Sequence, residues 1–411
     1  MTPHVPASSA LSGDPRFSGL AEAARVLQPR TVALRRRLHR QPEQGLAVPN
    51  TQAAVLRALD GLGLSVRTGT AVGSVVAVLT GARPGPTVLL RGDMDALPLQ
   101  EDTGLPYASE IPGSMHACGH DTHVAMLASA ARLLAGRRED LAGSVVFMFQ
   151  PGEEGYHGAK HMLDEGVLEA AGKPAESAFA LHITSKETTG VIRCRPGPIM
   201  ASADAFTVRV TGRGGHASTP ADAVDPVPAA AAMVGAVQTV LTRRISVFEP
   251  TVVTVARIAA GTTFNVIPET AELQGTLRSL SESSRATMLA ELPKVCEHVA
   301  AAHGCSVEFI PEPGYPVTVN DADVAARVQD LAAAVLGARH SLVMPNPLMG
   351  AEDFSYVLRQ VPGALAFLGA CPPGVKPADA APNHSNRVLF DESAMAHGVS
   401  AYAAFALDVL R

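Results

Sequence analysis

Nine consecutive residues, 115–123, form the densest group of metal-binding side-chain types in the chain. Their sequence is Met-His-Ala-Cys-Gly-His-Asp-Thr-His. Thiolates and imidazoles are common ligands of zinc-like cations, and the glycine lets the backbone turn so that Cys118 and His120 can face one cation. A single Cys-x-His would more often be a buried structural thiol with surface histidines. Three histidines and several nearby aspartates instead favour a metal site.

Carboxylates stand at the ends of two predicted strands. Residues 87–91 are mostly apolar and run into Gly-Asp-Met-Asp at 92–95, and residues 145–150 run into Pro-Gly-Glu-Glu-Gly at 151–155. Open α/β sheets place their sites at the C-terminal ends of strands. We therefore expect both groups of acids to lie near the segment 115–123.

The adjacent pair Glu153 and Glu154 can divide two tasks of a metallohydrolase. Neighbouring side chains of an extended chain point in opposite directions. One carboxylate can then face a cation while the other takes a proton from water. The alternative is a solvated acidic turn, and the pair alone does not decide between them.

Two histidines complete a candidate ligand set. His182 ends a predicted strand over 177–182, and His384 lies in a polar loop; either alone would more often be structural or superficial. The five donors are Cys118, His120, Glu154, His182 and His384. This number is too large for one tetrahedral zinc. It suits two cations that share a bridging ligand and a bridging water, with the thiolate as a candidate bridge.

The elements that must position these residues predict an α/β fold with an insertion. Strands at 75–79, 87–91, 145–149 and 177–182 alternate with helices at 21–40, 51–62 and 122–134, which predicts a mostly parallel sheet. We expect the first helix to be interrupted near Pro29. Residues 205–310 follow the order β-α-β-β-α-β of a ferredoxin-like module, with a long helix over 281–303 kinked at Pro293.

The predicted organisation has four segments. A flexible leader covers 1–19, an α/β domain covers 20–201 and resumes over 313–411, and the inserted module covers 202–312. A length of 411 residues fits two domains.

Composition restricts the partners and the compartment. A net charge of −6 argues against nucleic acid and anionic membranes, and no apolar stretch reaches the roughly 20 residues of a membrane span. We expect the run 35–37, Arg-Arg-Arg, to form the solvated face of a helix. Five irregularly spaced cysteines do not predict a disulfide framework, and no signal peptide is recognisable, so we expect a cytoplasmic protein.

The motifs together resemble the M20 metallopeptidase family, specifically its amidohydrolase branch of hippurate, N-acyl-amino-acid and auxin-conjugate hydrolases. The matching stretches, in family order, are RGDMDALP (91–98), MHACGHDTHVAML (115–127), FQPGEEG (149–155), LH (181–182), GRGGHAS (212–218), GTTFNVIPE (261–269), GTLRS (275–279), MGAEDFS (349–355) and NHS (383–385).

The resemblance implies a zinc-peptidase-like catalytic domain with two divalent metal ions, for which zinc, manganese, cobalt or nickel would fit the donors. It implies Cys118 as the bridging ligand, the other four donors as further ligands, and Glu153 as general base and acid. Other branches have a ligand histidine where Asp93 stands; here His120 takes over. Asp95 and Asp121 are then candidates for orienting the ligands.

The inserted module resembles the lid and dimerisation domain of the family, which implies a homodimer. His216 would reach the scissile carbonyl, in its own or the partner subunit's site, and stabilise the oxyanion. Asn265 and Arg278 resemble residues that hold a substrate carboxylate, a task that suits the planar guanidinium. The alternatives are an exposed loop histidine and a surface strand arginine.

The sequence departs from many relatives at Thr219-Pro220-Ala221 and at 183–186, so the acyl group stays open. The prediction is a dinuclear metal-dependent amidohydrolase that cleaves N-acyl amino acids or related amides bearing a carboxylate, by means of a metal-bridging water. One alternative is a dipeptidase or carboxypeptidase on the same scaffold. Another is a non-catalytic protein that binds metal or peptide, against which the base beside a ligand argues.

Overall fold

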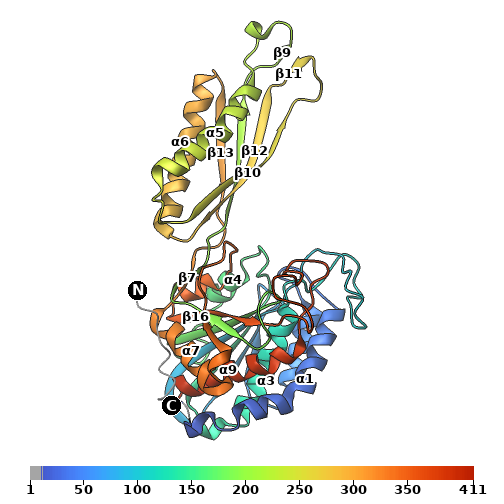
Figure 1. Ribbon diagram of the computed structural model, residues 1–411, viewed down its shortest axis with the longest axis vertical. Helices are drawn as coiled ribbons and strands as arrows, with labels where there is room; N and C mark the ends of the chain where they lie inside the picture. The colour runs from blue at the N-terminus through green and yellow to red at the C-terminus, as the bar shows by residue number, and fades with distance from the viewer. Residues whose placement is uncertain (1–10, 12) are drawn as a thin grey trace. The chain divides into compact units, whose positions relative to one another are not determined.

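The computed structural model describes residue 11 and residues 13–411, which form two compact units (Figure 1). The first unit comprises residues up to Gly197 together with Val319–Pro345 and Tyr356–Arg411; the second comprises Pro198–Thr318 and Asn346–Ser355. Of the leader expected over 1–19, residues 1–10 and 12 lie outside the described residues. The described remainder includes a 3₁₀ helix at Pro15–Phe17, whose Phe17 is buried in the core.

The first unit is built on an eight-stranded sheet with the order β1-β2-β4-β3-β5-β16-β6-β15. The interior pairs β4–β3, β3–β5 and β5–β16 are parallel, which confirms the predicted mostly parallel α/β fold. The strands are β1 (Ser65–Thr68), β2 (Val75–Thr80), β3 (Arg83–Asp93), β4 (Ala142–Gln150), β5 (Ser177–Thr184), β6 (Ile192–Cys194), β15 (Ser341–Val343) and β16 (Gly363–Gly369).

Helices pack on this sheet and on one another. α3 contacts β3 and β5, α9 contacts the same two strands, and α1 lies against both helices. The central strands β4, β5 and β16 are mostly apolar, as expected where both faces of a sheet are covered. The helices are α1 (Leu20–Arg40), α2 (Pro49–Leu59), α3 (His120–Ala135), α4 (Gly158–Asp164), α7 (Ala322–Leu336), α8 (Ser355–Leu358) and α9 (Met395–Val409).

The predicted interruption of the first helix is wrong. α1 continues through Pro29, although a proline inside a helix removes one hydrogen bond and crowds the preceding turn. Buried residues occur on both sides of the proline, Leu20 and Ala24 before it and Thr31 and Arg35 after it. Packing of both halves on the core therefore holds the helix together.

The expectation that residues 35–37 form a solvated helix face is also wrong for most of the run. Arg35 is only 1% exposed and bonds to Asp121, while Arg36 pairs with Glu392. Only Arg37 is exposed and without a carboxylate partner among the described residues. Three consecutive residues of a helix point in three directions. One of these arginines is therefore buried, the next forms an ion pair and the third is exposed.

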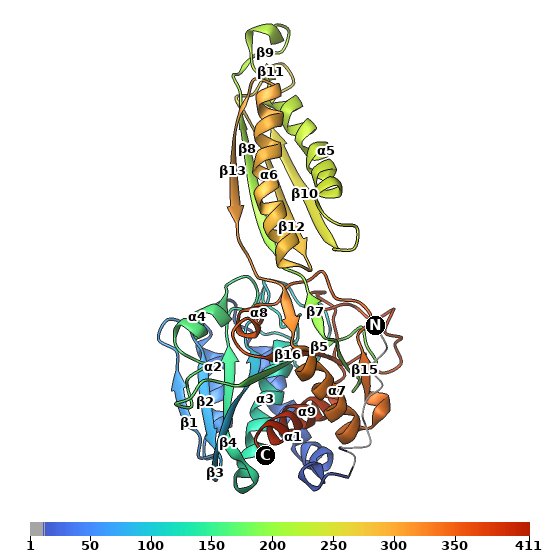
Figure 2. The ribbon, with the colours of Figure 1, turned by 90° about the vertical axis from the view of Figure 1, so that its left-hand side faces the viewer.

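The second unit contains the predicted β-α-β-β-α-β module (Figure 2). Its antiparallel sheet has the order β10-β12-β8-β13, and its apolar core lies between that sheet and the two helices α5 and α6. α6 runs on through Pro293, and the kink expected there stays a prediction. The elements are β8 (Asp204–Thr211), α5 (Pro226–Arg244), β10 (Thr251–Ala260), β12 (Thr270–Ser279), α6 (Glu282–Ala302) and β13 (Ser306–Glu312).

Short elements complete the chain. A two-stranded ribbon in the second unit pairs β9 (Gly215–His216) with β11 (Val266–Ile267), and β7 (Gly197–Met200) pairs with β14 (Thr318–Asn320). All five cysteines are free and buried, as the absence of a disulfide framework predicts. Among the described helices none has the length and apolar content that a bilayer crossing needs.

Candidate metal centre

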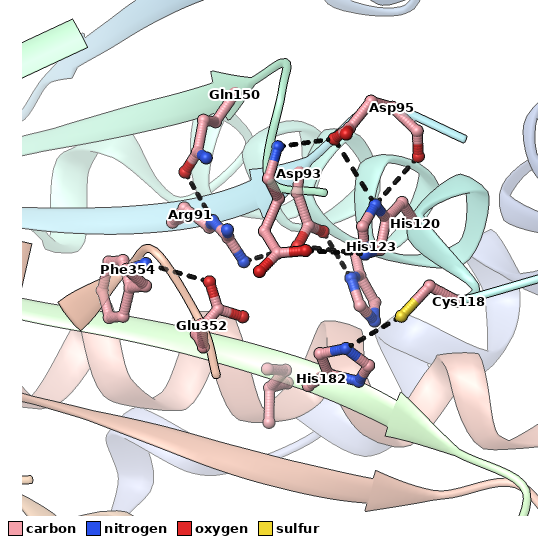
Figure 3. A network of polar contacts seen from close by, with 12 residues as sticks. Arg91, Asp93, Asp95, Cys118, His120, His123, Gln150, His182, Glu352 and Phe354 are labelled. Carbon is pink, nitrogen blue, oxygen red and sulfur yellow. Dashed lines mark hydrogen bonds and ion pairs between the residues drawn. The ribbon is translucent and has the colours of Figure 1, made fainter. Parts of the chain in front are cut away.

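Parallel strand pairing gathers the acids and His182 at one edge of the large sheet. Asp93, at the end of β3, is in register with Gln150 at the end of β4. On its other side β3 is parallel to β5, which delivers His182. Parallel strands end at the same edge, so the segments that follow them meet there (Figure 3).

The turn that precedes α3 requires glycine. Gly119 has φ = 90°, in the left-handed region, and a Cβ built there would lie 2.4 Å from a side-chain carbon of Ile183. Glycine meets both requirements because it has no side chain. The turn lets Cys118 and the first helical residue, His120, face the edge of the sheet.

Backbone carbonyls fix the rings of two histidines. His120 donates its Nδ1 hydrogen to the Asp95 carbonyl at 2.9 Å, and His182 donates its own to the Ile183 carbonyl at 2.8 Å. Both rings are buried, and Nε2 lies 3.4 Å from the Asp93 carboxylate in His120 and 3.4 Å from the Cys118 sulfur in His182. The Nε2 of His120 has no hydrogen-bond partner among the described residues. This arrangement is typical of imidazoles that bind metals.

Cys118 belongs to two groups of donor atoms. Its sulfur lies 3.4 Å from His182 Nε2, and these two residues with His120 place their donor atoms within 4.8 Å of one another. The same sulfur lies 3.2 Å from His384 Nε2, which is 3.2 Å from Glu154 Oε1. The five predicted donors thus form two groups that share one thiol, and their S, N and O atoms fit divalent transition metals.

Asp95 fixes the two glutamates. One of its carboxylate oxygens accepts the backbone N–H of Glu153 at 2.9 Å and the other accepts that of Glu154 at 3.0 Å. The Glu153 carboxylate is buried and lies 3.9 Å from His120 Nε2, beside the donor set. Asp95 therefore orients both glutamates through their backbone.

Hydrogen bonds anchor the loop that carries His384 to the site. Asn383 donates its amide hydrogens to the carbonyls of Cys118 and Ile183, each at 3.0 Å. His384 has φ = 69°, a conformation that non-glycine residues seldom adopt, and its N–H bonds to the Ala117 carbonyl. Strain of this kind persists only where surrounding contacts hold it. The sequence analysis gave Asn383 no role.

Burial and mutual hydrogen bonds shift the pKa values of the donor side chains. A hydrogen bond to the Cys118 thiol, and then one to Glu154, raise the pKa of His384 to about 10. Burial lowers the pKa of His182 well below its usual value, which keeps that ring neutral. Burial also raises the pKa of the Cys118 thiol. A bound cation would favour the thiolate and release the His384 proton.

A supporting network behind the donors was missed by the sequence analysis. Asp93 accepts hydrogen bonds from Arg91 at 2.6 Å and from His123 at 2.5 Å (Figure 3). Although burial opposes ionisation, Arg91 and then His120 hold the pKa of Asp93 well below its usual range. His123 also accepts the Ile183 N–H at Nε2, so it carries its proton on Nδ1. The only sequence signal was the third histidine of the 115–123 segment.

Asp121 contacts none of the candidate ligands directly. Its carboxylate accepts from Arg35 at 2.9 Å and from His39 at 2.8 Å, both on α1. The charge of Arg35 and then that of His39 lower its pKa, although burial opposes them. The residue joins α1 to the first turn of α3 and so holds the helix that carries His120.

The remaining predicted residues lie in the second unit. His216 is exposed on β9, where it pairs with Val266, and the carbonyl of Asn265 accepts the Ala217 N–H at 3.1 Å. His216 and Asn265 are therefore neighbours. Arg278 is near the other end of β12, opposite Val252 of β10, and is half-buried. The unit does not bring Arg278 together with the other two.

Comparison with known proteins decides the family. The model of peptidase family M20/M25/M40 matches residues 89–408. The chain belongs to this family. It is a metal-dependent hydrolase of the M20 family that acts on amide bonds, and the predicted membership of the amidohydrolase branch is confirmed.

Three proteins illustrate what the chain is similar to. Thermostable carboxypeptidase 1 of Saccharolobus solfataricus is 37% identical, over 94% of this chain and 97% of that protein. N-acetylcysteine deacetylase of Bacillus subtilis is 36% identical, over 84% of this chain and 90% of that protein. A crystal structure from Bacillus subtilis, described as a dinuclear metal-binding peptidase of the M20 family, has a TM-score of 0.80 and 31% identity, over 94% of this chain and 99% of that one.

Proposed function

We propose that this M20 enzyme is a dinuclear metal-dependent amidohydrolase whose two cations are held by Cys118, His120, Glu154, His182 and His384. The observation that carries the proposal is the thiol of Cys118, shared by two groups of donor atoms. The similar Bacillus subtilis structure is described as binding a dinuclear metal centre. Zinc, manganese, cobalt and nickel all fit the mixed donors.

When bound, the cations supply Lewis acidity to the amide carbonyl and lower the pKa of the attacking water. Glu153, buried beside the donors and oriented by Asp95, takes the proton of that water and returns it to the leaving amine. Positioning matters because the base must lie within hydrogen-bond reach of the proton that it moves. The supporting bonds of Asp95 provide this placement.

We propose that the substrate is an N-acyl amino acid or a related amide with a free carboxylate. The similarity to an N-acetylcysteine deacetylase supports this class. In this proposal His216 stabilises the oxyanion, while Asn265 and Arg278 bind the carboxylate. The alternative, a carboxypeptidase on the same scaffold, is favoured by the similarity to thermostable carboxypeptidase 1.

We further propose a homodimer formed by the second unit. Arg278 follows Thr270, at the start of β12, by eight residues, which in a strand is roughly 27 Å. His216 and Asn265 lie beyond that start, on the ribbon that β9 and β11 form. Within one protomer, Asn265 and Arg278 are therefore far apart, although both are proposed to bind the substrate carboxylate. A second copy can supply the missing part. The free, buried thiols support a reducing, cytoplasmic location.

The metal proposal is tested with Cys118→Ala and with Cys194→Ala, a matched loss of a buried thiol outside the donor set. We expect elemental analysis of the purified protein to show about two metal ions per native chain. We expect the same metal content for Cys194→Ala. For Cys118→Ala we expect a large loss of bound metal. An unchanged content in Cys118→Ala would refute the shared thiol.

The substrate proposal is tested with a panel of N-acetyl and N-benzoyl amino acids, their amidated counterparts, and dipeptides, each with added metals. We expect chelator-sensitive cleavage of the N-acyl acids and no cleavage when the carboxylate is amidated. Faster cleavage of peptides than of N-acyl acids would favour the carboxypeptidase alternative. Equal rates on the acid and the amide would remove Arg278 from substrate binding.

A further inference from the structure

A basic cleft lies between three helices of the first unit, away from the metal centre. Its walls are consecutive turns of α1, α2 and α3, and its volume is about 310 Å³. Alanines, Leu34 and Ser129 line it together with four arginines: Arg30, Arg37, Arg57 and Arg132. α3 places Arg132 twelve residues after His120, roughly 18 Å along the helix. The cleft is therefore separate from the donor set.

The spacing of the residues explains why the cleft exists. On α1 the lining residues recur at intervals of three and four, as they do on α2 and on α3, so each helix presents one stripe to the cleft. The small side chains Ala54, Ala58 and Ala128 leave space where larger ones would fill the junction of the three helices. Long arginines surround this space because they lie on the same stripes.

The arginines of the cleft lack carboxylate partners. Arg30, Arg37 and Arg57 make no ion pair with any residue that the structure describes. Arg132 donates to the Ala58 carbonyl at 3.2 Å, which still leaves its charge without an acid. Burial, and then the charge of Arg30, lower the pKa of Arg132. Four like charges thus surround one hollow in a chain whose net charge is −6.

A second hollow continues the first. Its volume is about 340 Å³, and Arg37, Arg57 and Ala54 line both. Thr51 on its wall is 1% exposed, and its hydroxyl has no hydrogen-bond partner among the described residues. A buried hydroxyl without a partner is costly unless a ligand or water satisfies it. The carboxylate of Glu43 already accepts the backbone N–H groups of two lining residues, Asn50 and Thr51.

We propose that this cleft binds a small anion with two or more phosphoryl groups. Several guanidinium groups around one hollow repel one another unless a multivalent anion neutralises them. Each guanidinium can make two parallel bonds to phosphate oxygens, and a phosphoryl group has oxygens enough for more than one arginine. No aromatic side chain lines the cleft, so a nucleobase would find no stacking surface there.

The test is calorimetric titration of the full-length, metal-loaded enzyme with fructose 1,6-bisphosphate, and separately with the tricarboxylate tricarballylate. We expect saturable binding of the bisphosphate that weakens as salt is added. The double variant Arg37→Gln/Arg57→Gln removes two charge-assisted contacts and should weaken binding by at least about 100-fold. Arg359→Gln, which removes an exposed arginine elsewhere in the unit, should leave the affinity unchanged.

The comparison also separates this site from the metal centre. If the bisphosphate bound to the metal ions instead, its affinity would be the same for the native enzyme and for the double variant, because the substitutions leave the metal-binding donors intact. Circular dichroism should show that both variants are folded. Absence of saturable binding, equal affinity of the double variant, or equal weakening by Arg359→Gln would each overturn the proposal. Tighter binding of tricarballylate than of the bisphosphate would overturn the assignment to phosphoryl groups.

Discussion

At the scale of single residues, the chemistry proposed here depends on the different surroundings of two adjacent carboxylates. Glu154 lies 3.2 Å from His384, within the donor set, whereas Glu153 is buried beside that set. Both are fixed by Asp95 through their backbone N–H groups. A substitution at either side chain therefore leaves the backbone bonds intact, and its effect reports on the role of the carboxylate itself.

We predict that Glu153→Gln retains the metal but loses about 10²–10⁴-fold in kcat, the usual contribution of a general base. The amide keeps the size of the side chain and cannot accept the proton. Steady-state kinetics and elemental analysis check the two halves of the prediction, and Glu169→Gln, which changes an exposed glutamate of the same unit, is the control. Near-native turnover would remove Glu153 from the mechanism.

The candidate ligands could be singled out from the sequence because few residue types bind transition metals. Cys118 and His120 are adjacent to one glycine, and Glu153 and Glu154 follow a strand, so local sequence was enough. His123 and Asn383 were not assigned, because their partners, Asp93 and the carbonyls of Cys118 and Ile183, come from other segments. A hydrogen-bond partner that is distant in sequence leaves no periodic signal.

At the scale of elements, His123 joins α3 to the ends of β3 and β5. It donates to Asp93 and accepts from the Ile183 N–H, and all three groups are buried. We predict that His123→Phe lowers the free energy of unfolding by about 3 kcal/mol, because it leaves a buried carboxylate oxygen and a buried N–H without partners. Chemical denaturation of the metal-free protein measures this.

A second variant, His123→Gln, is the comparison, since its amide can still donate to one partner or accept from the other. We expect His123→Gln to be more stable than His123→Phe and to bind metal more tightly than that variant does. Equal stability of the native protein and His123→Phe would show that the network contributes nothing.

α9 contains a partly buried histidine that should make stability depend on pH. Burial, and then the neighbouring His340, lower the pKa of His397 to about 4. Because the unfolded chain binds this proton at a higher pH than the folded one, the stabilisation is complete above about pH 6.5 and is lost as pH falls towards 4. We predict that His397→Gln flattens this part of the profile of stability against pH.

Thermal denaturation between pH 4 and pH 7.5 checks this prediction, with His303→Gln, an exposed histidine in the second unit, as the matched control. A His397→Gln profile as steep as that of the native protein would contradict it.

The elements themselves were predictable where periodicity is strong. The alternation of residues 205–310 gave the order of the inserted module, and the apolar runs gave β2 to β5. Pro29 misled the prediction, because local propensity was weighed without the packing that holds α1 on both sides of it. The short strands β6 and β15 have too few residues to show a pattern.

At the scale of the whole molecule, the separation of His216 and Arg278 within one protomer predicts complementation between subunits. His216→Ala and Arg278→Ala homodimers should each lose most activity. If each proposed site takes His216 from one chain and Arg278 from the other, a mixed dimer contains one intact site. We expect co-expressed, doubly tagged heterodimers to recover about half of native kcat.

Analytical ultracentrifugation should first confirm that the enzyme is a dimer. A His216→Ala/Arg278→Ala double variant mixed with native chains is the control, because its heterodimers retain no intact site. Heterodimers as inactive as the two parents would contradict the shared arrangement.

The pairing of β5 with β16 has a consequence for how the chain must fold as it is synthesised. Gly363, where β16 begins, follows the end of β5 by about 180 residues, nearly all of which the ribosome must release before the central sheet can close. The ferredoxin-like module is continuous in the chain and emerges within that interval. It can therefore reach its final form while the strands β1 to β5 still lack their neighbour β16, with the open edge of β5 in need of protection from aggregation.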